Sequence, residues 1–284
     1  MEKKIGIVLL NYKNYNDTIE CIKSIENQNY SNYCIIVVDN NSQNESVNKI
    51  KTSCKDMNNI YIIENKENLG FAKGNNIGIK FAKENLKSDF VFVLNTDTVL
   101  FNENTLKKLI SLYKPEEKIA IINPMCCDIE KVIQKPYLIY NSKMWKYVIR
   151  MGIYILKQII KYIFNLDKYK KNNEKFNVEE IKKNKYIIQG CAYILTPDFF
   201  KYYSQIFPET FLYCEELALA IYIEKANLKI ENSTDVLIIH KEAGSTKEIL
   251  KDRKKKKIKF QIQSYFKVVK LLFYDYKKIK KLYN

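Results

Sequence analysis

The segment that most constrains the fold is Phe90–Leu94, an uninterrupted apolar run that leads into Asn95, Thr96 and Asp97. A run rich in Val and Phe predicts a strand buried on both faces, as in a parallel sheet. A carboxylate at the carboxyl end of such a strand lies where open α/β sheets bind ligands, and its oxygens suit Mg²⁺ or Mn²⁺. The alternative is an Asx turn that only ends the strand.

Strand-like and helix-like segments alternate through the first half of the chain. This order predicts right-handed βαβ units and therefore an α/β fold with a mostly parallel sheet. We expect Asn16 or Asp17 to cap the first helix. The expected strands span residues 5–10, 35–38, 60–63, 90–94 and 119–122, and the expected helices span 17–27, 45–54, 71–84 and 106–113.

Composition is typical of a soluble globular protein of 284 residues, with 46% hydrophobic and 28% charged residues. The seven cysteines are scattered without paired spacing, which argues against a zinc site or a disulfide framework and favours a reducing cytoplasm. The apolar run after the first four residues is too short for a signal-peptide core.

Two segments of the middle region have their own character. Apolar residues recur at helical spacing over 145–166, but Lys and Arg interrupt them, so the segment is too short to span a bilayer. We expect a helix that covers the core or the acceptor site, with a membrane interface as the alternative. Residues 168–185 are charged and Asn-rich, which favours an exposed loop or a lid.

The positive charge is concentrated at the carboxyl end. The chain has a net charge of +16, of which residues 251–284 contribute +11 and residues 1–250 contribute +5. Apolar residues recur there at steps of three and four, which predicts a basic amphipathic helix. Such a helix is typical of membrane-surface binding, although it can also pack on the fold or form a dimer seam. The folded part has no recognisable basic stripe, which argues against nucleic acid.

Three further stretches carry candidate functional groups. Val37–Ser42 ends a strand with Asp39 and two Asn residues, and Asn68–Gly78 has glycines four residues apart, which permits close approach of a helix. Phe207–Leu217 contains adjacent carboxylates at a helix start. The glycine spacing fits neither a P-loop nor a dinucleotide-binding fingerprint, and packing or a capped helix terminus would also explain these stretches.

Together with Asn95–Asp97, and in this order, the stretches resemble the family 2 glycosyltransferases with the GT-A fold. The likeness is greatest to the bacterial rhamnosyltransferase-like branch that builds capsule, O-antigen or wall polysaccharide, and it covers roughly residues 5–246. It implies a Rossmann-like mixed sheet flanked by helices, a nucleotide-sugar donor, Mn²⁺ or Mg²⁺, and inversion. We expect a domain at 1–246, with nucleotide-sugar and acceptor halves at 1–124 and 125–246, and a helical extension at 247–284.

The resemblance also implies roles for individual residues. Asp97 is the expected metal ligand, with Asn95 in place of the first acid of the family's D-x-D motif, and His240 is expected to contact metal or diphosphate. Glu216 is the expected general base and Glu215 its neighbour, although the family usually has Asp at the base position. The expected nucleotide-sugar residues are Asn11, Tyr12, Asp39, Asn41, Asn68, Gly70, Lys73, Gly74, Asn75, Asn95 and Thr96.

Lys73 and Lys241 are candidates for neutralising the diphosphate, and a solvated surface lysine is the alternative for each. His240, the sole histidine, follows the apolar run at 236–239, and a structural hydrogen-bonding role is the alternative for it.

These observations lead us to expect an inverting enzyme that moves a sugar from a UDP- or dTDP-sugar to a saccharide acceptor. A lipid-linked acceptor, a cytoplasmic location at the inner face of the membrane, contact with anionic lipid through residues 251–284, and a homo-oligomer through the last helix are further expectations. One alternative is a sugar-1-phosphate nucleotidyltransferase, although the amino-terminal Gly-rich loop that such an enzyme needs is missing. Another is a degenerate, membrane-associated transferase. Two departures from the family suggest it: Asn95 stands in place of an acid, and Ala218 stands where relatives often have Asp.

Overall fold

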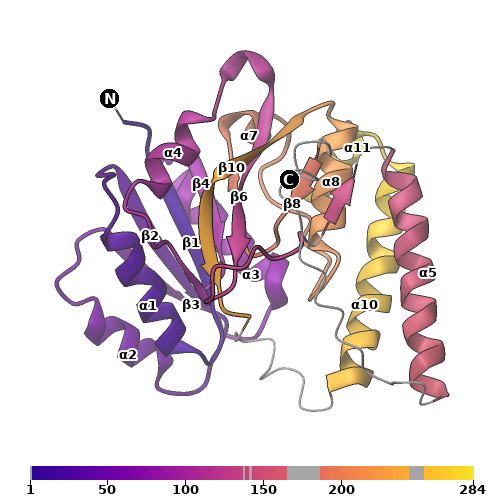
Figure 1. Ribbon diagram of the computed structural model, residues 1–284, viewed down its shortest axis with the longest axis horizontal. Coiled ribbons are helices and arrows are strands. Elements are labelled where there is room, and N and C mark those ends of the chain that lie inside the picture. Colours follow the sequence, from indigo (N-terminus) through magenta and orange to yellow (C-terminus); the bar gives the residue numbers. More distant parts are fainter. Residues whose placement is uncertain (1, 137, 141–142, 165–185, 243–252) are drawn as a thin grey trace.

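The computed structural model describes residues 2–136, 138–140, 143–164, 186–242 and 253–284. An eight-stranded sheet in the order β3-β2-β1-β4-β9-β6-β10-β5 crosses the molecule, with helices on both faces (Figure 1). Most neighbouring strands are parallel, while β9 runs antiparallel to both β4 and β6. The expected α/β fold, a mixed and mostly parallel sheet flanked by helices, is confirmed.

The strands of the described residues include the five expected ones, each of which starts within two residues of its expected position. The strands are β1 (Ile5–Asn11), β2 (Tyr33–Asp39), β3 (Ile60–Glu64), β4 (Phe90–Leu94), β5 (Thr98–Val99), β6 (Ile119–Cys127), β7 (Leu138–Tyr140), β8 (Tyr186–Ile188), β9 (Ala192–Leu195) and β10 (Lys229–His240). Strand β6 extends five residues beyond its expected end, because Met125, Cys126 and Cys127 continue to pair with β10.

The helices on the two faces of the sheet are α1 (Tyr15–Glu26), α2 (Ser46–Ser53), α3 (Gly70–Glu84), α4 (Thr105–Ser111), α5 (Met144–Ile163), α7 (Pro197–Tyr202), α8 (Glu215–Lys225), α10 (Arg253–Val269) and α11 (Tyr276–Tyr283), with 3-10 turns η1 (Pro115–Glu117) and η2 (Lys270–Phe273). The cap of α1 differs from the expected one. Asn14 takes this role, because its side-chain oxygen accepts a hydrogen bond from the backbone N–H of Asp17.

The register of the parallel strands determines which polar residues meet. Asn11 lies opposite Asp39 across β1 and β2, and Leu9 lies opposite Leu94 across β1 and β4. The carboxyl ends of these three strands therefore share one edge of the sheet. All five residues of β4 are buried, and a hydrophobic cluster covers each face of the sheet, so this edge is held rigidly in place.

The carboxyl-terminal helices pack on the same core as the rest of the fold. Val268, Leu271 and Ile279 are fully buried in the cluster that includes the apolar residues of α8. Of the predicted apolar stripe, Val269 and Tyr276 pack partly buried against this cluster, while Phe266 and Phe273 stay exposed. The predicted domain boundary at 246/247 lies outside the described residues, and the predicted division at 124/125 falls within β6.

Helix α5 only partly meets the expectation that it covers the core. Val148 and Ile155 are buried, but Trp145, Ile149 and Ile153 are each about half exposed. None of the helices in the described part of the chain combines the length and apolarity needed to cross a bilayer. The loop or lid expected at 168–185 lies outside the described residues.

Candidate active site

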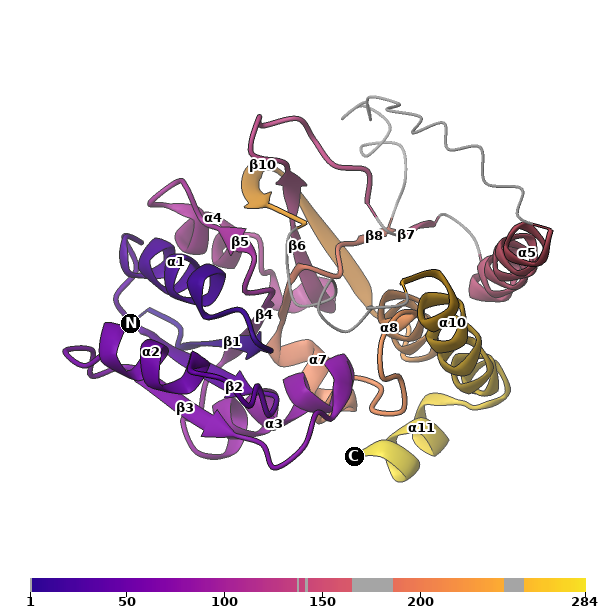
Figure 2. The same cartoon turned by 90° about the horizontal axis from the view of Figure 1, so that it is seen from below.

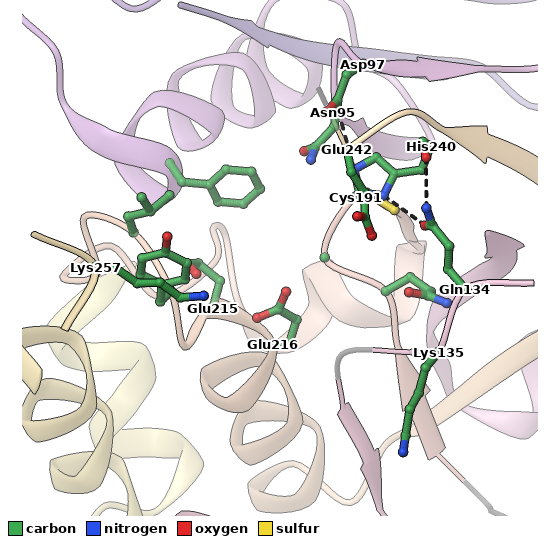
Figure 3. Close-up of a pocket in the computed structure, with 15 residues that line it drawn as sticks. Asn95, Asp97, Gln134, Lys135, Cys191, Glu215, Glu216, His240, Glu242 and Lys257 are labelled. Atoms are coloured by element: carbon green, nitrogen blue, oxygen red, sulfur yellow. Dashed lines mark hydrogen bonds and ion pairs between the residues drawn. The ribbon is translucent and has the colours of Figure 1, made fainter. Parts of the chain in front are cut away.

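A cavity of about 460 Å³ opens beside the carboxyl end of β4 (Figure 3). One wall carries Asn95, Asp97 and His240, and the other carries Glu215 and Glu216 at the start of α8. Thus the two groups that the sequence assigned to donor and acceptor chemistry face one space. The rest of the lining comprises Phe71, Gln134, Lys135, Gln189, Gly190, Cys191, Leu212, Tyr213, Glu242 and Lys257.

The turn after β4 is held by backbone and side-chain hydrogen bonds. The Asn95 N–H donates to the Cys191 carbonyl at 2.8 Å, and the Thr98 hydroxyl donates to the Asn95 carbonyl at 2.6 Å. Thr96 is buried. This turn both ends the strand and directs Asp97 and Asn95 toward the cavity, so the two interpretations of the sequence are compatible.

The side chains of Asp97, in the turn after β4, and of His240, at the end of β10, lie close together. The Oδ1 atom of Asp97 lies 3.6 Å from Nε2 of His240, and their side chains are 8% and 19% exposed. The other ring nitrogen of His240 lies 3.1 Å from Oε1 of Gln134, whose amide nitrogen donates to the His240 carbonyl at 2.9 Å. Gln134 therefore fixes the ring so that Nε2 faces the carboxylate.

The charge state of His240 follows from opposing influences. Burial lowers the pKa of His240, but the adjacent Cys191 and the carboxylates of Asp97 and Glu242 outweigh burial and raise the pKa to about 9. The neighbouring carboxylates of Asp97 and Glu242 thus favour the protonated imidazole. A divalent metal that bound Nε2 would have to displace that proton.

The arrangement of Asp97 and His240 fits a divalent ion with few protein ligands. Metal–ligand bonds of about 2.1 Å separate two ligands of one ion by roughly 3 to 4 Å, and Mg²⁺ usually takes its other ligands from water and substrate phosphates. Within the described residues, no group of three or more His, Cys, Asp or Glu is arranged to hold a metal. The Asn95 amide and the Glu242 carboxylate are further oxygen groups in this part of the lining.

Glu215 and Glu216 follow a strained turn. Tyr213 and Cys214 have φ angles of 73° and 68°, the left-handed region that costs a non-glycine residue on the order of 1 kcal/mol or more. This turn starts α8 so that both carboxylates face the cavity (Figure 3). Burial raises the pKa of both groups well above the ordinary 4.5, and the charge of Glu216 adds to the effect on Glu215.

The two carboxylates differ in their surroundings. Glu215 is 9% exposed, and its Oε1 has no hydrogen-bond partner among the described residues. Glu216 is more exposed and lies against Gly190, where an added Cβ would stand 1.9 Å from its Oε1. Gly190 has no side chain and thus leaves the space that the Glu216 carboxylate occupies. Of the two carboxylates, Glu216 is the more exposed.

Asp39 is embedded in a hydrogen-bond network at the ends of β1 and β2. Its Oδ1 accepts from the Asn11 amide at 2.6 Å and from the Ser42 hydroxyl at 2.5 Å, and its Oδ2 accepts from the Ser42 N–H at 2.9 Å. Tyr12 and Asn41 are partly exposed beside this network. These three hydrogen bonds fix the orientation of the carboxylate, and its contact with a nucleotide stays a prediction.

A second network joins β2 to the start of α3. The Asn40 amide donates to Asn68 at 2.9 Å and to the Gly70 carbonyl at 3.2 Å, while its oxygen accepts from the Leu69 N–H at 3.0 Å. Gly70 has a φ of 79°, and a Cβ there would meet the Phe211 carbonyl at 2.5 Å. Asn68 and Gly70 thus lie at the edge where the sequence placed them.

Other expected nucleotide-sugar residues have structural contacts. A Cβ at Gly74 would meet Leu10 at 2.5 Å, and the Asn75 amide donates to the Phe71 carbonyl at 3.0 Å. Both residues are buried between α3 and the sheet, as expected for helix packing. Lys73 is exposed and does not line the cavity. Contact of these three residues with a nucleotide stays a prediction.

Lys241 has partners elsewhere. Its ammonium group lies 2.9 Å from Asp17 and 2.6 Å from Glu20, both in α1. The lysine thus ties the end of β10 to that helix instead of facing the diphosphate position, which corrects the expectation for it.

Several lining residues were not identified from the sequence. Gln134, Gly190 and Lys257 come from segments without a readable motif, and their roles depend on contacts across the fold. Asn40 carried a usable signal, since it lies in the same strand-end motif as Asp39.

Comparison with known proteins gives a family and a fold. The model of the family described as "Glycosyl transferase family 2" matches residues 6–181, more than half of the chain. The low-salt glycan biosynthesis hexosyltransferase Agl10 of Haloferax volcanii is 28% identical over 120 residues, which cover 42% of this chain and 36% of Agl10.

Two solved structures share the fold at low sequence identity. The mannosyltransferase PcManGT from Pyrobaculum calidifontis, in complex with GDP-Man and Mn²⁺, superposes with a TM-score of 0.56 at 11% identity, over 84% of this chain and 57% of that one. S. aureus TarS 1–349 in complex with UDP gives a TM-score of 0.54 at 13% identity, over 83% and 59%. The chain thus spans about a third of Agl10 and less than two thirds of either solved chain.

Proposed function

The chain belongs to glycosyl transferase family 2, and from that premise we propose that it transfers a sugar from a nucleotide-sugar to a hydroxyl group of an acceptor. One observation carries the proposal. A single cavity joins the strand-end pair Asp97 and His240 to the adjacent acids Glu215 and Glu216, whose pKa values are raised. Such a cavity can hold a charged leaving group at one wall and deprotonate an acceptor at the other.

The proposed reaction is inverting and single-step. The acceptor oxygen forms a bond to the anomeric carbon while the bond from that carbon to the diphosphate oxygen breaks. The Glu216 carboxylate takes the proton from the attacking hydroxyl, because a base with a raised pKa retains its proton affinity near neutral pH. The second carboxyl group, Glu215, keeps the pKa of the pair high and holds the start of α8.

The diphosphate side of the cavity is the proposed metal site. A Mn²⁺ or Mg²⁺ ion held by Asp97, with Asn95 and His240 as further ligands, would neutralise charge on the diphosphate. The mannosyltransferase of similar fold is complexed with Mn²⁺. Asp97 is the sole acid of the Asn95-Thr96-Asp97 turn, so it carries the charge that attracts the ion.

The proposed donor is a UDP- or dTDP-sugar. A uracil or thymine N3–H needs an acceptor, which Asp39 supplies as a fixed carboxylate. Hexosyl transfer to a lipid-linked saccharide in capsule, O-antigen or wall polysaccharide synthesis, at the cytoplasmic face of the membrane, is the proposed setting. The two structures of similar fold hold GDP-Man and UDP, so GDP-sugars belong in the test.

The test is release of nucleoside diphosphate from UDP-, dTDP- and GDP-sugars with Mn²⁺ or Mg²⁺. We expect Asp97→Ala and Glu216→Ala each to reduce release at least a hundredfold. Glu84→Ala is the matched control, because that acid lies on the outer face of α3 and its side chain is 64% exposed. Full release by both site variants would refute the assignment of the site.

A further inference from the structure

Helix α5 presents a continuous apolar stripe to solvent. Trp145, Ile149, Ile153, Leu156, Ile160 and Ile163 recur at steps of three and four residues and are 48%, 51%, 49%, 56%, 41% and 65% exposed. A helix that only covers a core keeps such a stripe buried. Contiguous exposed apolar surface of this kind marks an interaction site.

The charges that α5 itself carries around the stripe are all of one sign, and the nearby Glu224 of α8 accepts a hydrogen bond from the Met144 N–H at the start of the helix. Lys146, Arg150, Lys157 and Lys161 lie next to stripe residues and are exposed, and Met144–Ile163 contains no Asp or Glu. Helix α10 packs along α5 (Figures 1 and 2) and adds further exposed lysines without an acid of its own. The described surface of this helix pair is therefore apolar and cationic.

The two helices form a fixed unit. A Cβ at Gly152 of α5 would meet the Tyr265 hydroxyl of α10 at 2.5 Å, so the backbone of α5 approaches this ring closely. Val148 and Ile155 of α5 and Val268 of α10 are buried in the same region. The stripe is thus on the face opposite a packed inner face, and helix α5 lies at the outer edge of the molecule (Figure 2).

We propose that the α5–α10 pair docks on an anionic lipid bilayer, with the α5 stripe inserted among the acyl chains near the headgroups. Interfacial helices combine an apolar face with flanking Lys and Arg, which attract anionic lipid. Trp145 at one end of the stripe suits the membrane–water interface. A second copy of this chain is a poor occupant, because stripe-to-stripe contact would bring the cations of two α5 helices together without acids between them.

The sequence led us to expect membrane contact through the tail, with a membrane interface at 145–166 as an alternative for that segment, whereas the proposed contact combines α5 with α10. The tail contributes charge, while several of its apolar residues are occupied by packing. Lys257 of α10 lines the cavity, so the helix that supports the bilayer face also reaches the site. That link to a lipid-linked acceptor rests on the proposed function, whereas the docking surface does not.

Trp145 is the single tryptophan of the chain and reports directly on the stripe. The full-length protein is mixed with vesicles of phosphatidylglycerol and phosphatidylcholine, or of phosphatidylcholine alone. We expect a blue shift of the tryptophan emission, and its quenching by brominated acyl chains, with the anionic vesicles at low salt. An unchanged emission, equal binding to neutral vesicles, or a shift that depends on protein concentration without vesicles would each overturn the proposal.

Matched variants separate the stripe from general exposure. Ile153→Asp should weaken vesicle partitioning on the order of tenfold, because it places a charge in the inserted face. Ile129→Asp, at an exposed apolar residue that is 72% accessible in the turn after β6, should leave partitioning unchanged. Unfolding midpoints verify that both variants fold. Partitioning is measured without sugar transfer, so its failure is distinguishable from failure of the proposed function.

The flanking charge is tested in the same assay. Lys157→Gln with Lys161→Gln should weaken binding about tenfold or more, since each cation near an anionic surface contributes about fivefold. The pair Lys107→Gln with Lys108→Gln, on the exposed face of α4, is the control. Equal loss in both pairs would show that overall charge, and not this surface, governs binding, which would also overturn the proposal.

Discussion

Two buried acids at the same edge of the sheet have opposite surroundings. Asp39 is 4% exposed and accepts three hydrogen bonds from Asn11 and Ser42. Glu215 is 9% exposed, and its Oε1 has no hydrogen-bond partner among the described residues. Burial and the neighbouring carboxylate of Glu216 raise the pKa of Glu215, so this acid keeps its proton more readily than an exposed one.

This difference distinguishes two parts of the molecule. The platform is the ends of β1 and β2 around Asp39, and the reactive wall is the start of α8 with Glu215 and Glu216. The amino-terminal strand ends use their polar groups to hold one another, which suits the recognition of a donor in one orientation. The start of α8 instead stores backbone strain at Tyr213 and Cys214 and raises the pKa of the neighbouring acids. The platform can therefore be tested through stability and donor binding, and the reactive wall through turnover.

The largest expected effect is at Glu216. Glu216→Gln keeps the size of the side chain but removes the base, so kcat should fall on the order of 10²- to 10⁴-fold. Nucleoside diphosphate release at saturating donor measures it. Glu215→Gln should reduce kcat less. The reverse order would exchange the roles of the two residues.

The next effect is at Gly190. A methyl group there would stand 1.9 Å from Oε1 of Glu216, so Gly190→Ala must displace that carboxylate. A displacement of about 1 Å can lower kcat on the order of a hundredfold. The free energy of unfolding should change less, because the flexible end of the Glu216 side chain can move aside.

Gly78→Ala is the contrasting variant. Its Cβ would meet Val8 at 2.4 Å inside the contact between α3 and the sheet, so it should lower the free energy of unfolding and leave kcat near its original value. Loss of turnover at Gly78 with normal turnover at Gly190 would contradict the comparison.

The platform is tested at Asp39. Asp39→Asn leaves the Ser42 and Asn11 donors poorly matched and should lower the free energy of unfolding by about 1–3 kcal/mol. Denaturant unfolding measures this change, and a raised KM for the donor should accompany it. Asp56→Asn, at an exposed acid, should change neither quantity. An unaltered unfolding midpoint in Asp39→Asn would show that the network does not stabilise the platform.

The smallest effect is on the pH dependence of stability. The pKa of Glu215 is higher in the folded chain than the 4.5 of the unfolded chain, so its contribution to stability is complete below pH 4.5 and is lost as the pH rises toward the folded pKa. Glu215→Gln should therefore gain about 1–2 kcal/mol relative to the original chain between acidic and mildly alkaline pH. Parallel curves for the two proteins in thermal unfolding at several pH values would argue against a raised pKa.

The sequence predicted what depends on local pattern. The strand at Phe90–Leu94 is found at the expected residues, and Asn11, Asp39 and Asn95 meet at one edge because parallel strands share their carboxyl ends. The family resemblance placed Glu215 and Glu216 at a helix start, where they are found.

Contacts between segments that lie far apart in the sequence could not be predicted from local patterns. Gly190 and Glu216 are 26 positions apart, and only the fold shows that one leaves room for the other. Lys241 was a candidate for neutralising the diphosphate, but just beyond the end of β10 its ammonium group pairs with Asp17 and Glu20 of α1, which only the fold brings near. The exposure of the α5 stripe could not be predicted either, because helical spacing shows that a helix has an apolar face but not what that face contacts.

The most direct test of the central claim is the pH profile of kcat/KM for nucleoside diphosphate release. If Glu216 is the base, the rate should rise with pH through the neutral range, well above 4.5, because the deprotonated carboxylate is the active form. The same profile for Glu216→Gln should be low and lack that rise. An identical rise in the variant would contradict the account, because another group would then be removing the proton.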